Sequence, residues 1–130
     1  MSLRSPLGRV LGKGSAQEGV GHWWTQRLTA LALIPLTIWF VLALLGLETL
    51  SYATVHEWLG RPANALGALI LVIALLWHSH LGVQVVVEDY VHHEGLKVLA
   101  RILLIFTHAL AGAVAVYAIL MVALAHGSAL

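Results

Sequence analysis

Histidine is the residue with the widest range of chemistry in this sequence, and four of its eight histidines lie in one segment, 78-HSHLGVQVVVEDYVHH-93. The chain has no cysteine and two methionines, so a bound metal would depend mainly on imidazole ligands. On a helix, His78 is about 16 Å from Asp89 along the axis, deep within the apolar part of the segment. A neutral imidazole there can bind iron through one ring nitrogen while an acceptor holds its other N–H.

Two interpretations of His78 stay open on the residues alone. In the first it is an axial ligand of a haem, and Gly82, one turn further on, leaves room for a flat macrocycle or a closely packed helix. In the second it is a neutral histidine that forms a hydrogen bond between helices. Both agree with the general cost of ionisable residues inside a membrane, which usually face a partner, a cavity or a cofactor.

The other histidines give weaker signals. His80 points about 200° away from His78 on a helix, so we expect a packing or hydrogen-bonding role for it. His108 lies at a similar depth in the next apolar segment, which makes a haem held between His78 and His108 of the same chain geometrically possible. His92 and His93 are expected in a solvated loop.

A second polar group opens the first apolar segment, in the pattern 21-GHWWTQR-27. Arg27 can extend its charged end to lipid headgroups, as arginines at helix ends commonly do. Its planar guanidinium can instead bind a carboxylate such as a haem propionate. His22 lies close to the same membrane surface.

Asp89 and Tyr90 end the second apolar segment. A tyrosine hydroxyl at this position can donate a hydrogen bond to a quinone carbonyl, and a neighbouring carboxylate can orient it or relay protons. The alternative is an interfacial anchor tyrosine beside a solvated acid.

The elements that position these residues are predicted to be membrane helices. The composition is 60% hydrophobic and 10% charged, and the net charge of +1 gives no reason to expect nucleic acid as a partner. Three windows of at least 20 residues lack Asp, Glu, Lys and Arg, namely Leu28–Leu47, Pro62–Val87 and Ile102–Leu130. The sequence therefore predicts an all-α membrane protein with transmembrane helices over 23–47, 63–88 and 98–125.

The distribution of basic residues predicts how these helices are oriented. Four basic residues lie at or before Arg27, and Lys97 and Arg101 follow the second helix, whereas Arg61 is the one basic residue between the first two helices. The positive-inside rule then gives a cytoplasmic N-terminal segment and a periplasmic C-terminus. The predicted connections and ends are a cytoplasmic segment 1–22, an external connection 48–62, a cytoplasmic connection 89–97 and an external tail 126–130.

Two motifs in this order resemble a known family. The pattern H-x-x-x-G-x-x-x-x-x-x-D-Y resembles the second helix of the smaller cytochrome b membrane anchor of succinate dehydrogenase, respiratory complex II. GHWWTQR followed by LTALALIPL resembles its first helix, and the resemblance covers about residues 15–125. One departure is Glu88, where the family commonly has a small hydroxyl residue.

The resemblance implies roles for five residues. His78 would be one axial ligand of the iron of haem b, the other coming from a histidine of a sister anchor subunit, so that His108 is not the partner ligand. Arg27 and His22 would face the haem propionates. Tyr90 would hydrogen-bond ubiquinone, and Asp89 would support that site electrostatically.

The resemblance also implies the assembly. The chain would sit in the bacterial inner membrane, surrounded by lipids, and pack with a cytochrome b sister anchor subunit into a bundle around haem b. An iron–sulfur subunit and a flavoprotein subunit would complete the complex, which couples the tricarboxylic acid cycle to the respiratory chain. The chain itself would not oxidise succinate. The alternatives are a quinol:fumarate reductase anchor, a haem-free structural anchor and a small cytochrome that uses both His78 and His108.

Overall fold

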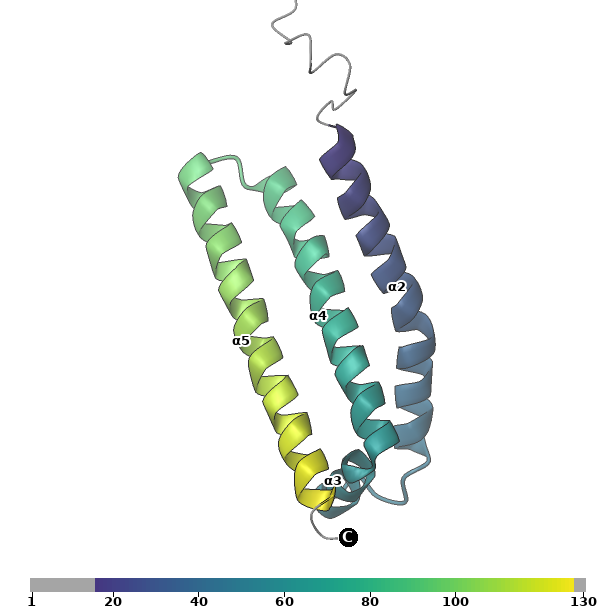
Figure 1. The fold of residues 1–130 in the computed structure, drawn as a ribbon. Coiled ribbons are helices and arrows are strands. Elements are labelled where there is room, and N and C mark those ends of the chain that lie inside the picture. The colour runs from purple at the N-terminus through teal and green to yellow at the C-terminus, as the bar shows by residue number, and fades with distance from the viewer. Residues whose placement is uncertain (1–15, 128–130) are drawn as a thin grey trace, which may run out of the picture.

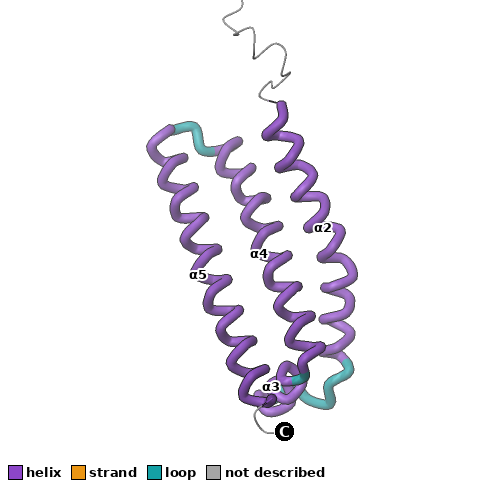
Figure 2. The backbone as a smooth tube through the Cα atoms, in the orientation of Figure 1, coloured by secondary structure: helices purple, strands orange, loops and turns teal. Residues whose placement is uncertain are grey.

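The computed structural model describes residues 16–127, with side chains over 20–125. It contains three long helices and one short one: α2 (Ala16–Leu45), α3 (Tyr52–Gly60), α4 (Pro62–Tyr90) and α5 (Glu94–Gly127). Figure 2 shows that helices and their connections account for the whole described region, which contains no strand. The predicted all-α fold is therefore confirmed.

Helix α4 is the central element. It packs against α2 on one side and α5 on the other, while α2 and α5 do not pack against each other within residues 16–127. Figure 1 shows the three long helices side by side with α4 in the middle. The start of α2, the end of α4 and the start of α5 lie at one end of the bundle, and α3 lies at the other.

Each long helix is long and apolar enough to cross a membrane. The candidate spans are Val20–Leu45, Pro62–Tyr90 and Glu94–Ala125. Large apolar side chains are exposed along all three, among them Leu31 on α2 and Phe106 on α5. In water this surface would be unfavourable, whereas hydrocarbon solvates it. The chain is a multi-pass membrane protein.

The helix bounds differ from the expected ones mainly at the ends. Helix α2 begins at Ala16, before the expected start at residue 23, and α5 begins at Glu94. Residues 1–15 of the predicted N-terminal segment and 128–130 of the predicted tail lie outside the described residues. Where the membrane surfaces cross the chain stays a prediction.

The short helix α3 was not expected, because the sequence analysis treated residues 48–62 as a connection. Ser51 caps it: the Ser51 hydroxyl accepts a hydrogen bond from the Thr54 N–H at 3.3 Å. Arg61 ends α3, and Pro62 at the first turn of α4 supplies the fixed φ that favours a helix start. With nine residues, α3 is too short for the spacing of its apolar residues to distinguish a helix from a loop.

Packing around α3 forms the core of this end of the bundle. The ring of Trp58 on α3 lies 5.8 Å from Trp39 and 6.0 Å from Phe40 of α2, centroid to centroid. Below it, Ala65 and Ala68 of α4 are buried together with Ile119 of α5. The small alanines let the helices approach closely, so this cluster joins α3, α4 and α5, while the ring contacts of Trp58 add α2.

Candidate functional site

His78 lies on the side of α4 that faces α2. Its Nδ1 is 3.1 Å from the hydroxyl oxygen of Thr29, and both side chains are partly buried. The Thr29 hydroxyl also lies close to the preceding turn of α2, at 2.9 Å from the Thr25 carbonyl oxygen and 3.0 Å from the Gln26 carbonyl oxygen. Helix α4 is thus joined to α2 at His78, the histidine that the sequence analysis singled out.

The hydroxyl of Thr29 has one proton and two carbonyl oxygens of its own helix within hydrogen-bonding distance. When that proton is donated to α2, a hydroxyl lone pair accepts from the Nδ1–H of His78. In this tautomer Nε2 carries the free lone pair, and no hydrogen bond to it is present in the described part of the chain.

Space beside His78 comes from Gly82, one turn further along α4. A methyl group placed at Gly82 would lie 3.6 Å from Nε2 of Gln26, an ordinary contact, with nothing closer. Gln26 and Thr29 therefore both face α4. The absence of a side chain at Gly82 leaves space between α2 and α4 one turn from His78.

His22 and Arg27 do not share a face of α2. Nε2 of His22 is buried and has no hydrogen-bond partner among the described residues. Arg27 is exposed, and its guanidinium carbon lies 5.2 Å from the centre of the Trp23 ring, a cation–π arrangement. Five residues along a helix correspond to about 140° of rotation, which explains the separation. Whether either side chain meets a haem propionate stays a prediction.

His108 lies between α5 and α4 with both ring nitrogens engaged. Its Nδ1–H donates to the Leu104 carbonyl at 2.9 Å, and its Nε2 lies 2.9 Å from the hydroxyl of Ser79, which is also 3.2 Å from the Leu76 carbonyl. His78 faces α2 instead. The two rings therefore lie on different sides of α4, which argues against a haem held by His78 and His108 together.

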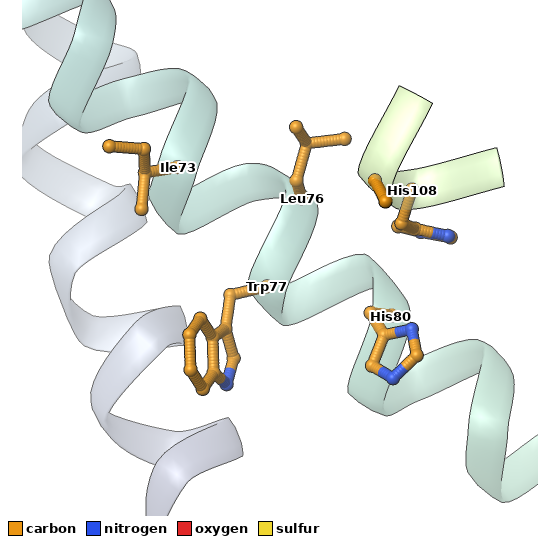
Figure 3. A pocket seen from close by; sticks show the side chains of 6 residues that line it. Ile73, Leu76, Trp77, His80 and His108 are labelled. Atoms are coloured by element: carbon orange, nitrogen blue, oxygen red, sulfur yellow. The ribbon is translucent and has the colours of Figure 1, made fainter. Parts of the chain in front are cut away.

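His80 faces α5, away from His78, as its position in the sequence predicted. Its ring centre is 5.3 Å from that of His108 in an edge-to-face arrangement. Figure 3 shows the two histidines on neighbouring helices, beside Leu76 and Trp77. They line a groove of about 410 Å³ whose remaining walls are apolar.

Asp89 and Tyr90 lie at the end of α4, on the surface. Tyr90 is 77% exposed, and no hydrogen bond to either side chain is present among residues 16–127. The backbone carbonyl of Tyr90 accepts from Nδ1–H of His92 at 3.0 Å. Both functional groups are therefore free to contact a substrate or another subunit.

Glu88 has partners that the sequence analysis did not foresee. Its carboxylate accepts a hydrogen bond from Arg101 of α5 at 2.7 Å and another from Gln84 at 3.0 Å. The four-residue spacing of Gln84 and Glu88 was a usable signal for the second contact. The α4–α5 pairing was not readable from spacing, because it depends on the turn at residues 91–93.

Comparison with known proteins identifies the family. Residues 1–116 match the family described as succinate dehydrogenase/fumarate reductase transmembrane subunit. The chain belongs to this family. The succinate dehydrogenase hydrophobic membrane anchor subunit of Rickettsia bellii is 35% identical over 95 residues, which cover 73% of this chain and 76% of that protein. No solved structure matches the chain.

Other relatives carry similar names. The succinate dehydrogenase hydrophobic membrane anchor subunit of Paracoccus denitrificans is 33% identical over 90 residues, covering 69% of this chain and 70% of the relative. The succinate dehydrogenase membrane anchor subunit of Reclinomonas americana is 31% identical over 91 residues, covering 68% and 76%. The resemblance inferred from the two motifs is thereby confirmed, and this member of the family is a membrane anchor subunit.

Proposed function

We propose that this membrane anchor subunit belongs to a succinate:ubiquinone oxidoreductase, where it would contribute a histidine ligand to a haem b and part of the ubiquinone site. Its partners are a cytochrome b sister anchor subunit, which would supply a second histidine, an iron–sulfur subunit and a flavoprotein subunit. The complex lies in the bacterial inner membrane, with the turn at residues 91–93 on the cytoplasmic side, as the basic residues favour.

The observation that carries the haem proposal is the contact between His78 and Thr29. Histidines that bind metals usually donate their second ring N–H to an acceptor, which fixes the tautomer and the ring orientation. Thr29, 3.1 Å from Nδ1, would be such an acceptor and would leave Nε2 for iron. Gly82 keeps the neighbouring turn free of a side chain.

The residues of this chain therefore fit a haem, which would supply one-electron redox chemistry. His78 would hold the iron on one side, and Thr29 would keep the ring in the ligating tautomer. The guanidinium of Arg27, exposed in the N-terminal half of α2, could bind a propionate, and His22 lies in the same half of the helix but on another face.

The quinone proposal depends on the exposed end of α4. The hydroxyl of Tyr90 is able to donate to a quinone carbonyl, because no group in residues 16–127 occupies it. Asp89 beside it would orient the substrate or pass protons from the aqueous side. Electrons reach this site from the iron–sulfur subunit, so succinate oxidation itself needs no residue of this chain.

The haem proposal is tested on the purified complex by a reduced-minus-oxidised absorption spectrum. We expect a b-type band in the wild type and its loss in His78→Ala, with the four subunits still co-purifying. His108→Ala is the matched control, because it removes an imidazole at similar depth that lies on the other side of α4. It should keep the band.

The other outcomes decide between the alternatives. A wild-type complex without a b-type band would make this subunit a haem-free anchor. Loss of the band in His108→Ala, with assembly intact, would support the alternative in which His78 and His108 of this chain hold the haem together. An unchanged spectrum in His78→Ala would exclude His78 as a ligand.

A further inference from the structure

The last turn of α4 has an unfavourable distribution of charge. Glu88 and Asp89 are two carboxylates in succession, at the helix end where the backbone dipole is negative and cations are preferred. The last turn of α4 contains no basic residue. A cation from another element would offset this repulsion, which is worth about 0.3–1 kcal/mol for each charge near a helix end.

Arg101 of α5 is that cation. Its guanidinium lies 2.7 Å from a carboxylate oxygen of Glu88, and the same oxygen accepts from Gln84 at 3.0 Å. The side chains of Arg101 and Glu88 are 47% and 38% exposed, so the pair is partly shielded from solvent. The contact links the end of α4 to the second turn of α5, across the turn at residues 91–93.

Tyr90 depends directly on this turn. It is the last residue of α4, two positions after Glu88, and the N–H of Val91 closes the helix on the Val87 carbonyl at 3.1 Å. Unwinding of one turn would release this hydrogen bond and move the Tyr90 hydroxyl. Its side chain is exposed and forms no hydrogen bond within the described residues, so the position of the hydroxyl follows the helix backbone.

We infer that Arg101, acting through Glu88, is a positioning residue for the ubiquinone site. It does not touch the quinone; it neutralises the acidic end of α4 and keeps Asp89 and Tyr90 in one fixed arrangement. This inference rests on the proposed quinone function of Tyr90.

The test compares steady-state kinetics of the purified complex with a short-chain ubiquinone and with an artificial dye acceptor. Arg101→Gln leaves two unpaired carboxylates at the end of α4. We expect the KM for ubiquinone to rise about threefold to fivefold, the range of a partly exposed ion pair. Dye reduction and the haem spectrum should not change, because neither depends on the end of α4.

A double variant, Arg101→Gln with Glu88→Gln, tests whether Arg101 acts by neutralising the acidic helix end or only through its contact with Glu88. Glu88→Gln removes one of the two acids together with the ion pair, so its KM should rise less than that of Arg101→Gln. Adding Glu88→Gln to Arg101→Gln should lower the KM again, because only Asp89 then remains at the negative helix end. A double variant as impaired as Arg101→Gln overturns the inference.

Lys97 provides the matched control. It is also on α5, but its ion pair is with Glu94 of the same helix, at 3.7 Å. Lys97→Gln should leave the KM unchanged, and Arg101→Lys, which keeps the charge, should lie between wild type and Arg101→Gln. An unchanged KM in Arg101→Gln, or an equal loss of dye and quinone reduction in Arg101→Lys, overturns the inference.

Failure of this inference can be told apart from failure of the proposed function. If Tyr90→Phe impairs ubiquinone reduction but Arg101→Gln does not, the quinone site stands and Arg101 has no positioning role. If Tyr90→Phe itself has no effect, the quinone function of this end of α4 is wrong.

Discussion

At the end of the bundle that α3 closes, the helices are held by aromatic and small apolar side chains, whereas at the opposite end α4 and α5 are joined by an ion pair. Trp58, Ala65, Ala68 and Ile119 are buried at the first end. At the second, Glu88 and Arg101 meet while Tyr90 remains exposed. The two ends belong to the same three helices.

The difference indicates that one end of the bundle determines stability and the other carries the functional groups. Apolar packing in this membrane bundle depends on shape, so the α3 end fixes how the helices are placed. The opposite end carries hydrogen-bonding groups that water or another subunit can reach. Changes at the first end should therefore lower stability, and changes at the second should alter function without unfolding the bundle.

The largest expected effect is at the α3 end. Trp58→Ala removes a ring that is 9% exposed and lies against Trp39 and Phe40. We expect a loss of about 3–5 kcal/mol in the free energy of unfolding, as for other buried tryptophans. A lower midpoint of thermal unfolding of the purified complex in detergent checks the direction of this effect.

Tyr52→Ala is the control for this variant, because Tyr52 is on the same helix but 83% exposed. It should change stability little. Equal losses for both variants would mean that α3 acts through its helical structure rather than through the Trp58 contacts.

A smaller loss is expected from Gly67→Ala. A methyl group at Gly67 would clash with the Trp39 ring, so the ring or the helix must shift. The ring cannot turn away freely, since it is packed against Trp58. We expect a destabilisation of about 1–3 kcal/mol by the same thermal assay.

Gly21→Ala is the matched helical glycine, with nothing within 4 Å of the added methyl. It should be neutral or slightly stabilising, because alanine favours a helix over glycine. Comparable destabilisation by both substitutions would contradict the close contact at Gly67.

These contacts show which parts of the fold were predictable. Three helices followed from three uncharged windows, because a membrane span needs about 20 apolar residues whatever its neighbours are. Helix α3 did not follow, since its Ser51 cap and its docking through Trp58 depend on tertiary contacts. The early start of α2 at Ala16 was missed because residues before the apolar window carry no hydropathy signal.

At the polar end, Tyr90→Phe tests function without removing the ring. Loss of the hydroxyl should lower ubiquinone reduction about tenfold, the equivalent of one hydrogen bond to substrate. Succinate oxidation with a dye acceptor should be unchanged, and so should the thermal unfolding midpoint. A parallel fall in both activities would point to misassembly and break the contrast between the two ends.

The candidate site was predictable in its individual residues but not in its partners. His78 and Asp89–Tyr90 stood out because polar groups are rare in apolar helices. Thr29 did not, because threonine is common in membrane helices and its contact with His78 spans 49 residues of sequence. His22 and Arg27 were treated together from sequence distance, and the helical rotation between them puts them on different faces.

The smallest predicted effect concerns Thr29, which lies between the two ends. Thr29→Val keeps the shape but removes the acceptor for His78 Nδ1–H. The b-type band should persist, while haem is released about fivefold faster to an apo-protein acceptor, in keeping with about 1 kcal/mol for one neutral hydrogen bond. Thr29→Ser retains the hydroxyl and should release haem at the wild-type rate. Equal release rates in Thr29→Val and wild type would show that His78 needs no partner on α2 and that its ring is oriented by packing alone.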